Sequence, residues 1–180
     1  MLKCYFRIFV LAGGAFFLGS LAADMNMYEG WGSVLSGLVT AGLFGSAAAA
    51  SIGTLHISRA RAVAGDRAKG DIYSLYQIRD VPLSVPYDRA FHAVAHYLGE
   101  VAKYNIVGSD QVAGLIEARI SSGPLGFSGS RLSASVRREG ENSVVTLRTA
   151  PALWPGLADY GRNLKAALDA EAYLTSAGRA

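Results

Sequence analysis

Two long apolar runs, separated by a short acidic segment, dominate the first third of the sequence. They occupy residues 8–23 and 33–57, and no charged residue occurs between Glu29 and Arg59. As a helix, the second run rises about 37 Å, which exceeds the roughly 30 Å hydrocarbon core of a bilayer. The second run therefore predicts a transmembrane helix. This prediction depends on the absence of charge more than on strong hydrophobicity, because small residues prevail in the run.

The first apolar run has two interpretations. As a helix it rises about 24 Å and crosses a bilayer with the help of the preceding aromatic residues and a snorkelling Arg7. As a secretory signal peptide, it follows the positive charges of Lys3 and Arg7 and ends in a small-residue cleavage site, Ser20-Leu21-Ala22. Residues 1–57 therefore form either a helical hairpin or a cleaved signal peptide followed by one transmembrane helix.

Beyond residue 70, short strands alternate with two amphipathic helices. Apolar residues recur at the helical period in residues 86–103, where Pro86 suits a first helical position, and in residues 157–177. Alternating apolar and polar residues predict strands at 81–85, 104–107, 114–120, 131–138 and 143–149, with an earlier strand within 71–79. The last two strands form a hairpin across Glu139-Gly140-Glu141-Asn142.

This order of elements predicts an α+β fold class. An N-terminal transmembrane helical hairpin is followed by a small domain with a four- or five-stranded, mainly antiparallel sheet and two helices on one face. The chain divides into a membrane segment at residues 1–57, a basic linker at 58–70 and the α+β domain at 71–180. The second face of the sheet is left to meet water, the membrane or a partner.

Composition and charge place this organisation at a membrane. The chain is 51% hydrophobic and 17% charged, whereas about a quarter of the residues in soluble domains carry charge. Acidic residues alone lie between the two apolar runs, and basic residues flank both runs on their other side. By the positive-inside rule, we expect a bacterial inner-membrane protein with its C-terminal domain in the cytoplasm. If the second run does not insert, the domain is instead exported.

Small residues recur every four positions along both apolar runs. On a helix they form one stripe per run, in the manner of glycine-zipper segments, and such stripes let two backbones approach closely. The second run contributes Gly37, Ala41, Gly45, Ala49 and Gly53, and the first contributes Ala15, Gly19 and Ala23. The stripes predict helix packing against the other run, another copy of the chain or another membrane protein. The alternative is that the repeat arises by chance, because the helix is rich in Gly, Ala and Ser.

The linker is basic. Arg59, Arg61, Arg67 and Lys69 follow the second apolar run, and each basic residue near an anionic bilayer contributes about 1 kcal/mol of attraction. Membrane lipid is therefore an expected partner, although a topology determinant and tether would have the same residues. No nucleic-acid partner is expected, because basic residues exceed acidic ones by only three beyond Ile57 and no strand interleaves basic with aromatic residues.

One face of the helix at residues 86–103 carries titratable side chains. Asp88, His92, His96 and Glu100 are spaced four apart, and histidines at i and i+4 can reach one divalent metal. His92 and His96 are therefore candidate metal ligands, or a pH sensor. A solvated face with acid–histidine pairs is the alternative, because HAVAH lacks the glutamate of HExxH and no third ligand is marked. His56 is expected at the end of the membrane span.

No catalytic or cofactor-binding motif is present. The sequence has no GxSxG elbow, no phosphate-binding glycine loop with its lysine and no paired-carboxylate motif. Neither an enzyme nor a cofactor is therefore expected. The glycine-rich segment 121–130 instead places Leu125 and Phe127 at the centre of an exposed loop, so both are candidate partner-binding residues. A wide turn that tucks Phe127 into the core is the alternative.

The C-terminal half resembles a known family. The strand sequence VVTLRTA, followed by Asp159-Tyr160-Gly161-Arg162-Asn163 and an amphipathic helix, is similar to the end of the uncharacterised bacterial family catalogued as domain of unknown function fourteen-ninety-nine. The resemblance implies the same strand–helix–meander–helix order and no enzymatic mechanism. Within the motif, Asp159 suits a helix cap or a first-turn anion, and Asn163 suits a hydrogen bond to the incoming loop.

Together these patterns favour a membrane-anchored binding or scaffolding protein whose α+β domain contacts a protein or lipid partner. One alternative is an exported envelope domain with a cleaved signal peptide. The other is a metal-binding or pH-sensing module that uses His92 and His96.

Overall fold

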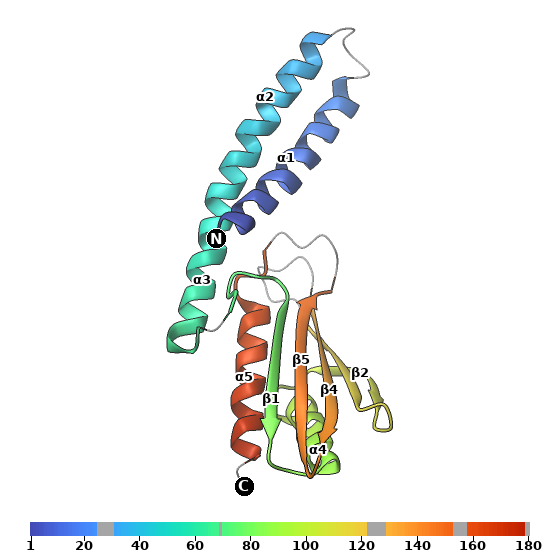
Figure 1. The fold of residues 1–180 in the computed structure, drawn as a ribbon. Coiled ribbons are helices and arrows are strands. Elements are labelled where there is room, and N and C mark those ends of the chain that lie inside the picture. The colour runs from blue at the N-terminus through green and yellow to red at the C-terminus, as the bar shows by residue number, and fades with distance from the viewer. Residues whose placement is uncertain (25–30, 69, 122–128, 153–157, 179–180) are drawn as a thin grey trace.

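The computed structural model describes residues 1–24, 31–68, 70–121, 129–152 and 158–178. It consists of a hairpin of two long helices joined to a small α+β domain (Figure 1). Helix α1 (Leu2–Asp24) lies antiparallel to α2 (Trp31–Ala48). Helix α2 continues through a π-helical segment, η1 (Ala49–Gly53), into α3 (Thr54–Ala64) and a 3₁₀ turn, η2 (Gly65–Arg67). A continuous helical path therefore leads from the hairpin to the domain.

Two of these helical stretches are long and apolar enough to cross a membrane. They are Leu2–Ala23, with 22 residues, and Val34–Arg67, with 34. Only 11% and 22% of their apolar windows are buried within the protein, so most of their apolar surface is turned outward. The prediction of two apolar N-terminal helices is confirmed. A signal sequence near the N-terminus has the same length and composition.

The predicted stripe of small residues along α2 and η1 lies on the inside of the hairpin. Its residues are all buried, namely Gly37, Ala41, Gly45, Ala49 and Gly53. A Cβ atom on Gly45 would lie 2.9 Å from the carbonyl oxygen of Phe9, and a Cβ atom on Gly13 would lie 3.0 Å from the carbonyl oxygen of Ala41. The two backbones therefore approach too closely for larger side chains at these positions.

The stripe expected on the first helix does not pack against α2, and its packing against another copy of the chain or another membrane protein stays a prediction. Ala15, Gly19 and Ala23 are exposed, because α1 turns another face, which includes Ile8 and Ala12, toward α2. Within one chain, the stripe of α2 therefore packs against a face of α1 that contains Ile8 and Ala12. The four-residue repeat of small residues did not predict this face.

The domain is built on one five-stranded antiparallel sheet with the order β1-β5-β4-β3-β2. The strands are β1 (Gln77–Leu83), β2 (Asn105–Asp110), β3 (Leu115–Ile120), β4 (Ser130–Glu139) and β5 (Asn142–Pro151). Helix α4 (Tyr87–His96), extended by a π-helical segment, η3 (Tyr97–Val101), follows β1, and α5 (Arg162–Ala177) follows β5. This confirms the predicted α+β fold with an antiparallel sheet and two helices on one face.

The core lies between the sheet and these two helices. Alternate strand residues point to the same face of a sheet, and one set is buried under α4 and α5. The set includes Val81, Ile116, Leu132, Val136, Val145 and Leu147, which pack with Phe91, Val94 and Leu98 of the α4–η3 segment and Ala166, Ala170 and Leu174 of α5. Among the described residues, no helix covers the opposite face of the sheet.

Several element boundaries differ from the predictions, and β2 runs to Asp110, beyond the strand expected at 104–107. A single strand, β1, takes the place of the two strands expected within residues 71–85, and its Pro82 is tolerated because β1 lies at an edge of the sheet. Helix α5 begins at Arg162, not at residue 157, because Gly161 has a left-handed backbone conformation that ends the preceding segment.

Candidate functional site at the base of the hairpin

Helix α3 contacts the N-terminal end of α5, and this contact joins the hairpin to the domain. Ala60 and Ala64 of α3 are buried against Leu164 and Leu168 of α5. Gly161 permits the close approach: its φ is +77°, and a Cβ atom there would lie 3.1 Å from the Cα of Ala60. We refer to this contact, together with the polar groups beside it, as the junction.

His56 is the polar centre of the junction. Its side chain is fully buried. Nε2 lies 3.1 Å from the carbonyl oxygen of Tyr73, and Nδ1 accepts a 3.2 Å hydrogen bond from the backbone N–H of Tyr160. These two partners are satisfied together by a neutral imidazole that carries its proton on Nε2. His56 therefore connects α2–α3 to the segment before β1 and to the segment before α5.

Asp159 organises the start of α5. Its Oδ1 accepts a hydrogen bond of 3.1 Å from the N–H of Gly161, and its Oδ2 accepts one of 2.9 Å from the N–H of Asn163. Oδ1 also lies 3.4 Å from Nδ1 of His56. A carboxylate at this position satisfies free amides at the helix N-terminus and interacts favourably with the helix dipole. Asp159 therefore acts as the expected anion at the start of this helix, although Gly161 occupies the N-cap position itself.

Asn163 extends the network into the sheet. Its side-chain Nδ2 donates a 2.6 Å hydrogen bond to the main-chain carbonyl oxygen of Leu75, ahead of β1. Its main-chain carbonyl oxygen accepts a 3.0 Å hydrogen bond from the hydroxyl of Thr149 in β5. Asn163 and Thr149 are both buried. The network therefore ties the start of α5 to β5 and to the segment ahead of β1, and its chemistry is that of positioning.

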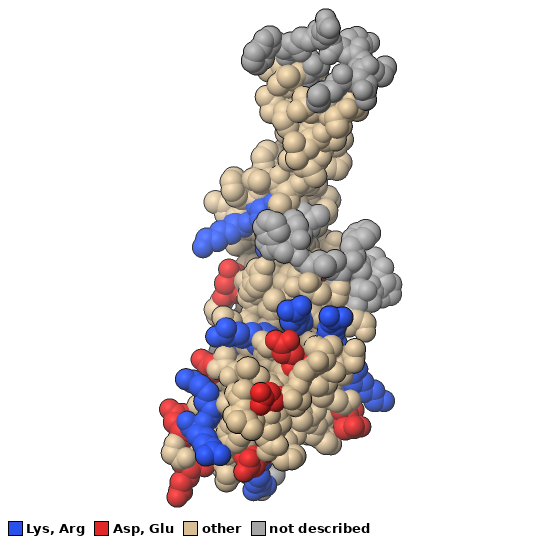
Figure 2. Space-filling view, turned by 90° about the vertical axis from the view of Figure 1, so that its right-hand side faces the viewer, with Lys and Arg blue, Asp and Glu red and all other residues tan. Residues whose placement is uncertain are grey.

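The outer surface of the hairpin is apolar. The large side chains exposed there include Leu2, Phe6, Val10, Leu18, Leu35, Leu38, Val39, Leu43 and Phe44. In the view of Figure 2, the described hairpin shows no acidic or basic side chains above its base. An apolar surface this extensive marks a membrane, partner or ligand contact.

Basic residues surround the base of the hairpin. Lys3 of α1 and Arg59 and Arg61 of α3 are exposed there. The Nε of Arg61 donates a 2.9 Å hydrogen bond to the Tyr73 hydroxyl, and its Nη2 lies 3.2 Å from the Sδ of Met1. We refer to Lys3, Arg59 and Arg61 as the basic collar. The collar brings the start of α1 and the predicted linker to the same level.

The two candidate metal ligands have separate hydrogen-bond partners. Nδ1 of His92 lies 2.7 Å from the carbonyl oxygen of Asp88, and Nδ1 of His96 lies 3.0 Å from the hydroxyl of Tyr173. Both histidines are exposed on α4. Within the described ranges, no group of three or more His, Cys, Asp and Glu residues is arranged to hold a metal ion. The metal-binding role of His92 and His96 stays a prediction.

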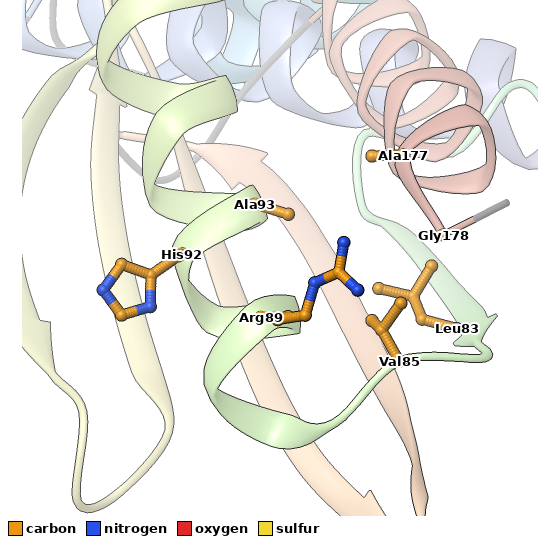
Figure 3. A pocket seen from close by; sticks show the side chains of 7 residues that line it. All are labelled: Leu83, Val85, Arg89, His92, Ala93, Ala177 and Gly178. Atoms are coloured by element: carbon orange, nitrogen blue, oxygen red, sulfur yellow. The ribbon is translucent and has the colours of Figure 1, made fainter. Parts of the chain in front are cut away.

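A small pocket lies at the end of the domain far from the hairpin. It measures about 280 Å³ and is bounded by the end of β1, the start of α4 and the end of α5. Figure 3 shows the Arg89 side chain directed between the two helices, whereas His92 points away on the other side of α4. Its volume is at the lower limit of the roughly 300–1,000 Å³ typical of ligand pockets, so we do not place the functional site there.

The predicted partner-binding residues Leu125 and Phe127 lie outside the described residues. The two strands that this segment connects are described. Ile120 at the end of β3 pairs with Ser130 at the start of β4. This end of the sheet is the one nearest the hairpin (Figure 1).

No family model and no curated protein matches the chain. Several solved structures are similar to part of it. A member of the major latex protein family from Arabidopsis thaliana is 15% identical, with a TM-score of 0.41, and the match covers 56% of this chain and 91% of that chain. A protein from Thermobifida fusca is 14% identical, with a TM-score of 0.38 and coverage of 59% and 95%. A protein from Thermus thermophilus is 14% identical, with a TM-score of 0.31 and coverage of 57% and 98%.

The sequence patterns marked His56 and Asp159 separately but did not connect them. His56 was expected to end the membrane span, whereas the structure encloses it in protein. One sequence feature indicates a special position for His56: it lies near the end of an uncharged run and only a few residues before the first arginine of the linker. Its partners lie in segments distant in the sequence, so no local pattern identified them.

Proposed function

We propose that the chain is a membrane-anchored binding or scaffolding protein. The hairpin is embedded in a bilayer, and the α+β domain is held at the cytoplasmic surface, where it contacts a protein or lipid partner. The observation that carries this proposal is the outward-facing apolar surface of α1 and α2, which water would solvate poorly.

The orientation follows from charge. The basic collar lies on the domain side of the hairpin, whereas Asp24 and Glu29 are the charged residues at the sequence positions that join its two helices. Basic residues are retained on the cytoplasmic side of bacterial membranes, and acidic residues have little influence. The proposal therefore locates the domain in the cytoplasm.

The packing of α1 supports a hairpin over a cleaved signal peptide. Cleavage after Ala22 would remove nearly the whole of α1. It would uncover the close contact at Gly45 and also that at Gly53, where a Cβ atom would lie 2.6 Å from the Tyr5 ring. A helix with a built partner surface of this kind is consistent with a retained α1.

The junction supports a positioning role for the anchor. A flexible tether would need no buried histidine, no apolar contact between α3 and α5 and no glycine fitted against Ala60. Because these contacts restrict the domain relative to the hairpin, the same surface of the domain is presented to the bilayer in each molecule. This is the arrangement that we expect of a scaffold at a membrane surface.

Two measurements on the full chain test the proposal. Carbonate-washed membranes should retain the protein, and a green fluorescent protein fused after Ala180 should fluoresce whereas alkaline phosphatase at the same position stays inactive. Release by carbonate would overturn the membrane anchor. Active phosphatase would favour the exported alternative, and intact mass of the purified protein would then show whether residues 1–22 are removed.

A further inference from the structure

The open face of the sheet carries a row of arginines at its hairpin end. Arg119 of β3 and Arg131 of β4 are direct cross-strand partners, and both are exposed. Arg148 of β5 is exposed on the same face. It pairs with Ser133 of β4, which is two residues after Arg131, so Arg148 and Arg131 are diagonal neighbours. Three guanidinium groups thus come from three adjacent strands. In the view of Figure 2, basic side chains gather in the upper part of the domain, with acidic side chains beside them.

These arginines form no ion pair with the described part of the protein. Among the described residues, the side chains within ion-pair distance are His56 with Asp159, where the imidazole is neutral, and Lys165 with Asp169; neither pair involves the row. Glu117 shares the face and stands opposite Ser133, but it forms no ion pair with the arginines within the described ranges. Like charges directly opposite each other destabilise a pair of strands. An anion bound between Arg119 and Arg131 would therefore be favoured.

The row lies at the end of the sheet that faces the membrane in the proposed arrangement. Ile120, Ser130 and Pro151 are paired at this end, and Thr149 of β5 is hydrogen-bonded to Asn163 in the junction. At the other end of the sheet, Arg137 and Arg138 are accompanied by Glu139 and Glu141, so the excess of positive charge belongs to the hairpin end.

We propose that Arg119, Arg131 and Arg148 bind the phosphate groups of anionic phospholipids in the membrane that holds the hairpin. This inference rests on the proposed function. Guanidinium groups bind phosphate through paired hydrogen bonds, and basic residues near a bilayer are attracted to anionic lipid. The junction restricts the domain so that the row faces the bilayer. Lipid headgroups are therefore the nearest source of phosphate. The hairpin end of the open sheet face thereby becomes a lipid-docking surface.

The test uses the full chain in nanodiscs. In a Cys4→Ala background, Ser135→Cys on the open face carries a fluorophore, and a trace of headgroup-labelled lipid quenches it at close range. Quenching should be stronger in discs that contain phosphatidylglycerol than in discs of phosphatidylcholine alone, and added salt should reverse the difference. Arg119→Gln combined with Arg131→Gln should lower the ratio of docked to undocked protein about 30-fold, or about fivefold for each arginine.

Arg137→Gln is the matched control, because Arg137 is exposed on the same face of the same strand as Arg131 but lies at the far end. It should leave quenching unchanged, whereas Arg131→Gln alone reduces it. Equal quenching in both kinds of disc, or an equal effect of the two single variants, would overturn the proposal. So would release of the wild-type domain by soluble glycerol 3-phosphate at low concentration, which would indicate a site for free phosphate. Failure of the chain to remain in the discs would instead contradict the membrane anchor.

Discussion

Nδ1 of His56 lies 3.4 Å from Oδ1 of Asp159, and both side chains are buried where α3 meets the start of α5. One belongs to the helix that continues from the apolar hairpin, and the other binds backbone amides at the start of the last helix of the domain. A buried polar pair of this kind holds its partners only while each hydrogen bond is satisfied. The pair therefore makes the attachment of the domain to the hairpin sensitive to single substitutions.

Replacement of His56 by Ala should loosen the junction. The N–H of Tyr160 and the carbonyl oxygen of Tyr73 would each lose a partner, and an unsatisfied buried group costs about 1–3 kcal/mol. We expect a loss of roughly 2 kcal/mol or more in the free energy of unfolding, together with faster protease cleavage between α3 and β1. Thermal unfolding and limited proteolysis of the detergent-solubilised chain measure both effects.

His92→Ala is the control for this substitution. His92 is exposed, so its removal should change stability by no more than about 0.5 kcal/mol. Similar melting temperatures for the two variants would show that the junction contributes little to the stability of the fold.

Gly161→Ala should destabilise the protein more than Gly140→Ala. Both glycines have positive φ, +77° and +65°, so an alanine at either position costs roughly 1–2 kcal/mol of backbone strain. Only at Gly161 does the added Cβ atom meet Ala60, at 3.1 Å, whereas Gly140 has open space. The extra loss at Gly161, about 1–3 kcal/mol for overpacking, measures the contact between α3 and α5 by denaturant unfolding. Equal losses would contradict that contact.

Gly45→Ala should weaken the hairpin, and Gly42→Ala should not. Both positions are helical, where alanine is favoured over glycine by about 0.5–1 kcal/mol. A Cβ atom at Gly45 would lie 2.9 Å from the backbone oxygen of Phe9, whereas one at Gly42 meets nothing within 4 Å. Titration of the detergent-solubilised chain with dodecyl sulfate should therefore unfold Gly45→Ala first. Equal or greater resistance of Gly45→Ala would contradict the α1–α2 packing.

Alkaline pH should reduce the stability of the domain through two tyrosines. Burial raises the pKa of Tyr97 above its ordinary value, and Tyr104 and Asp169 raise it further. Burial, followed by Asp169, raises the pKa of Tyr104 as well. The folded state thus holds these protons more tightly than the unfolded state, in which tyrosine ionises near pH 10.

Their contribution is complete below about pH 10 and is lost as the pH rises through the raised pKa values of the folded state. Denaturant unfolding at increasing pH should show this decline, and Tyr97→Phe should make it shallower. Ultraviolet titration of tyrosinate should show a fraction of tyrosines that ionises only on unfolding. Ionisation of all tyrosines in the folded chain near pH 10 would contradict this prediction.

The sequence by itself determined the features that depend on local periodicity. The uncharged stretch before Arg59 indicated the long helix, the four-residue spacing of Gly37, Ala41 and Gly45 indicated its inward face, and alternation in β4 and β5 indicated a sheet with one buried side. These signals arise because helices and strands repeat their side-chain directions over a few residues. They required no knowledge of distant contacts.

Only the tertiary structure decided which distant segments meet. It placed β1 beside β5, directed a different face of α1 toward Gly45, joined His56 to Asp159 and set Arg119 opposite Arg131. Each of these depends on how elements pack or on strand register, and a shift of one residue in register would turn Arg119 to the other face of the sheet. Local sequence patterns specify the elements and their buried faces, but long-range packing selects the partners of those faces.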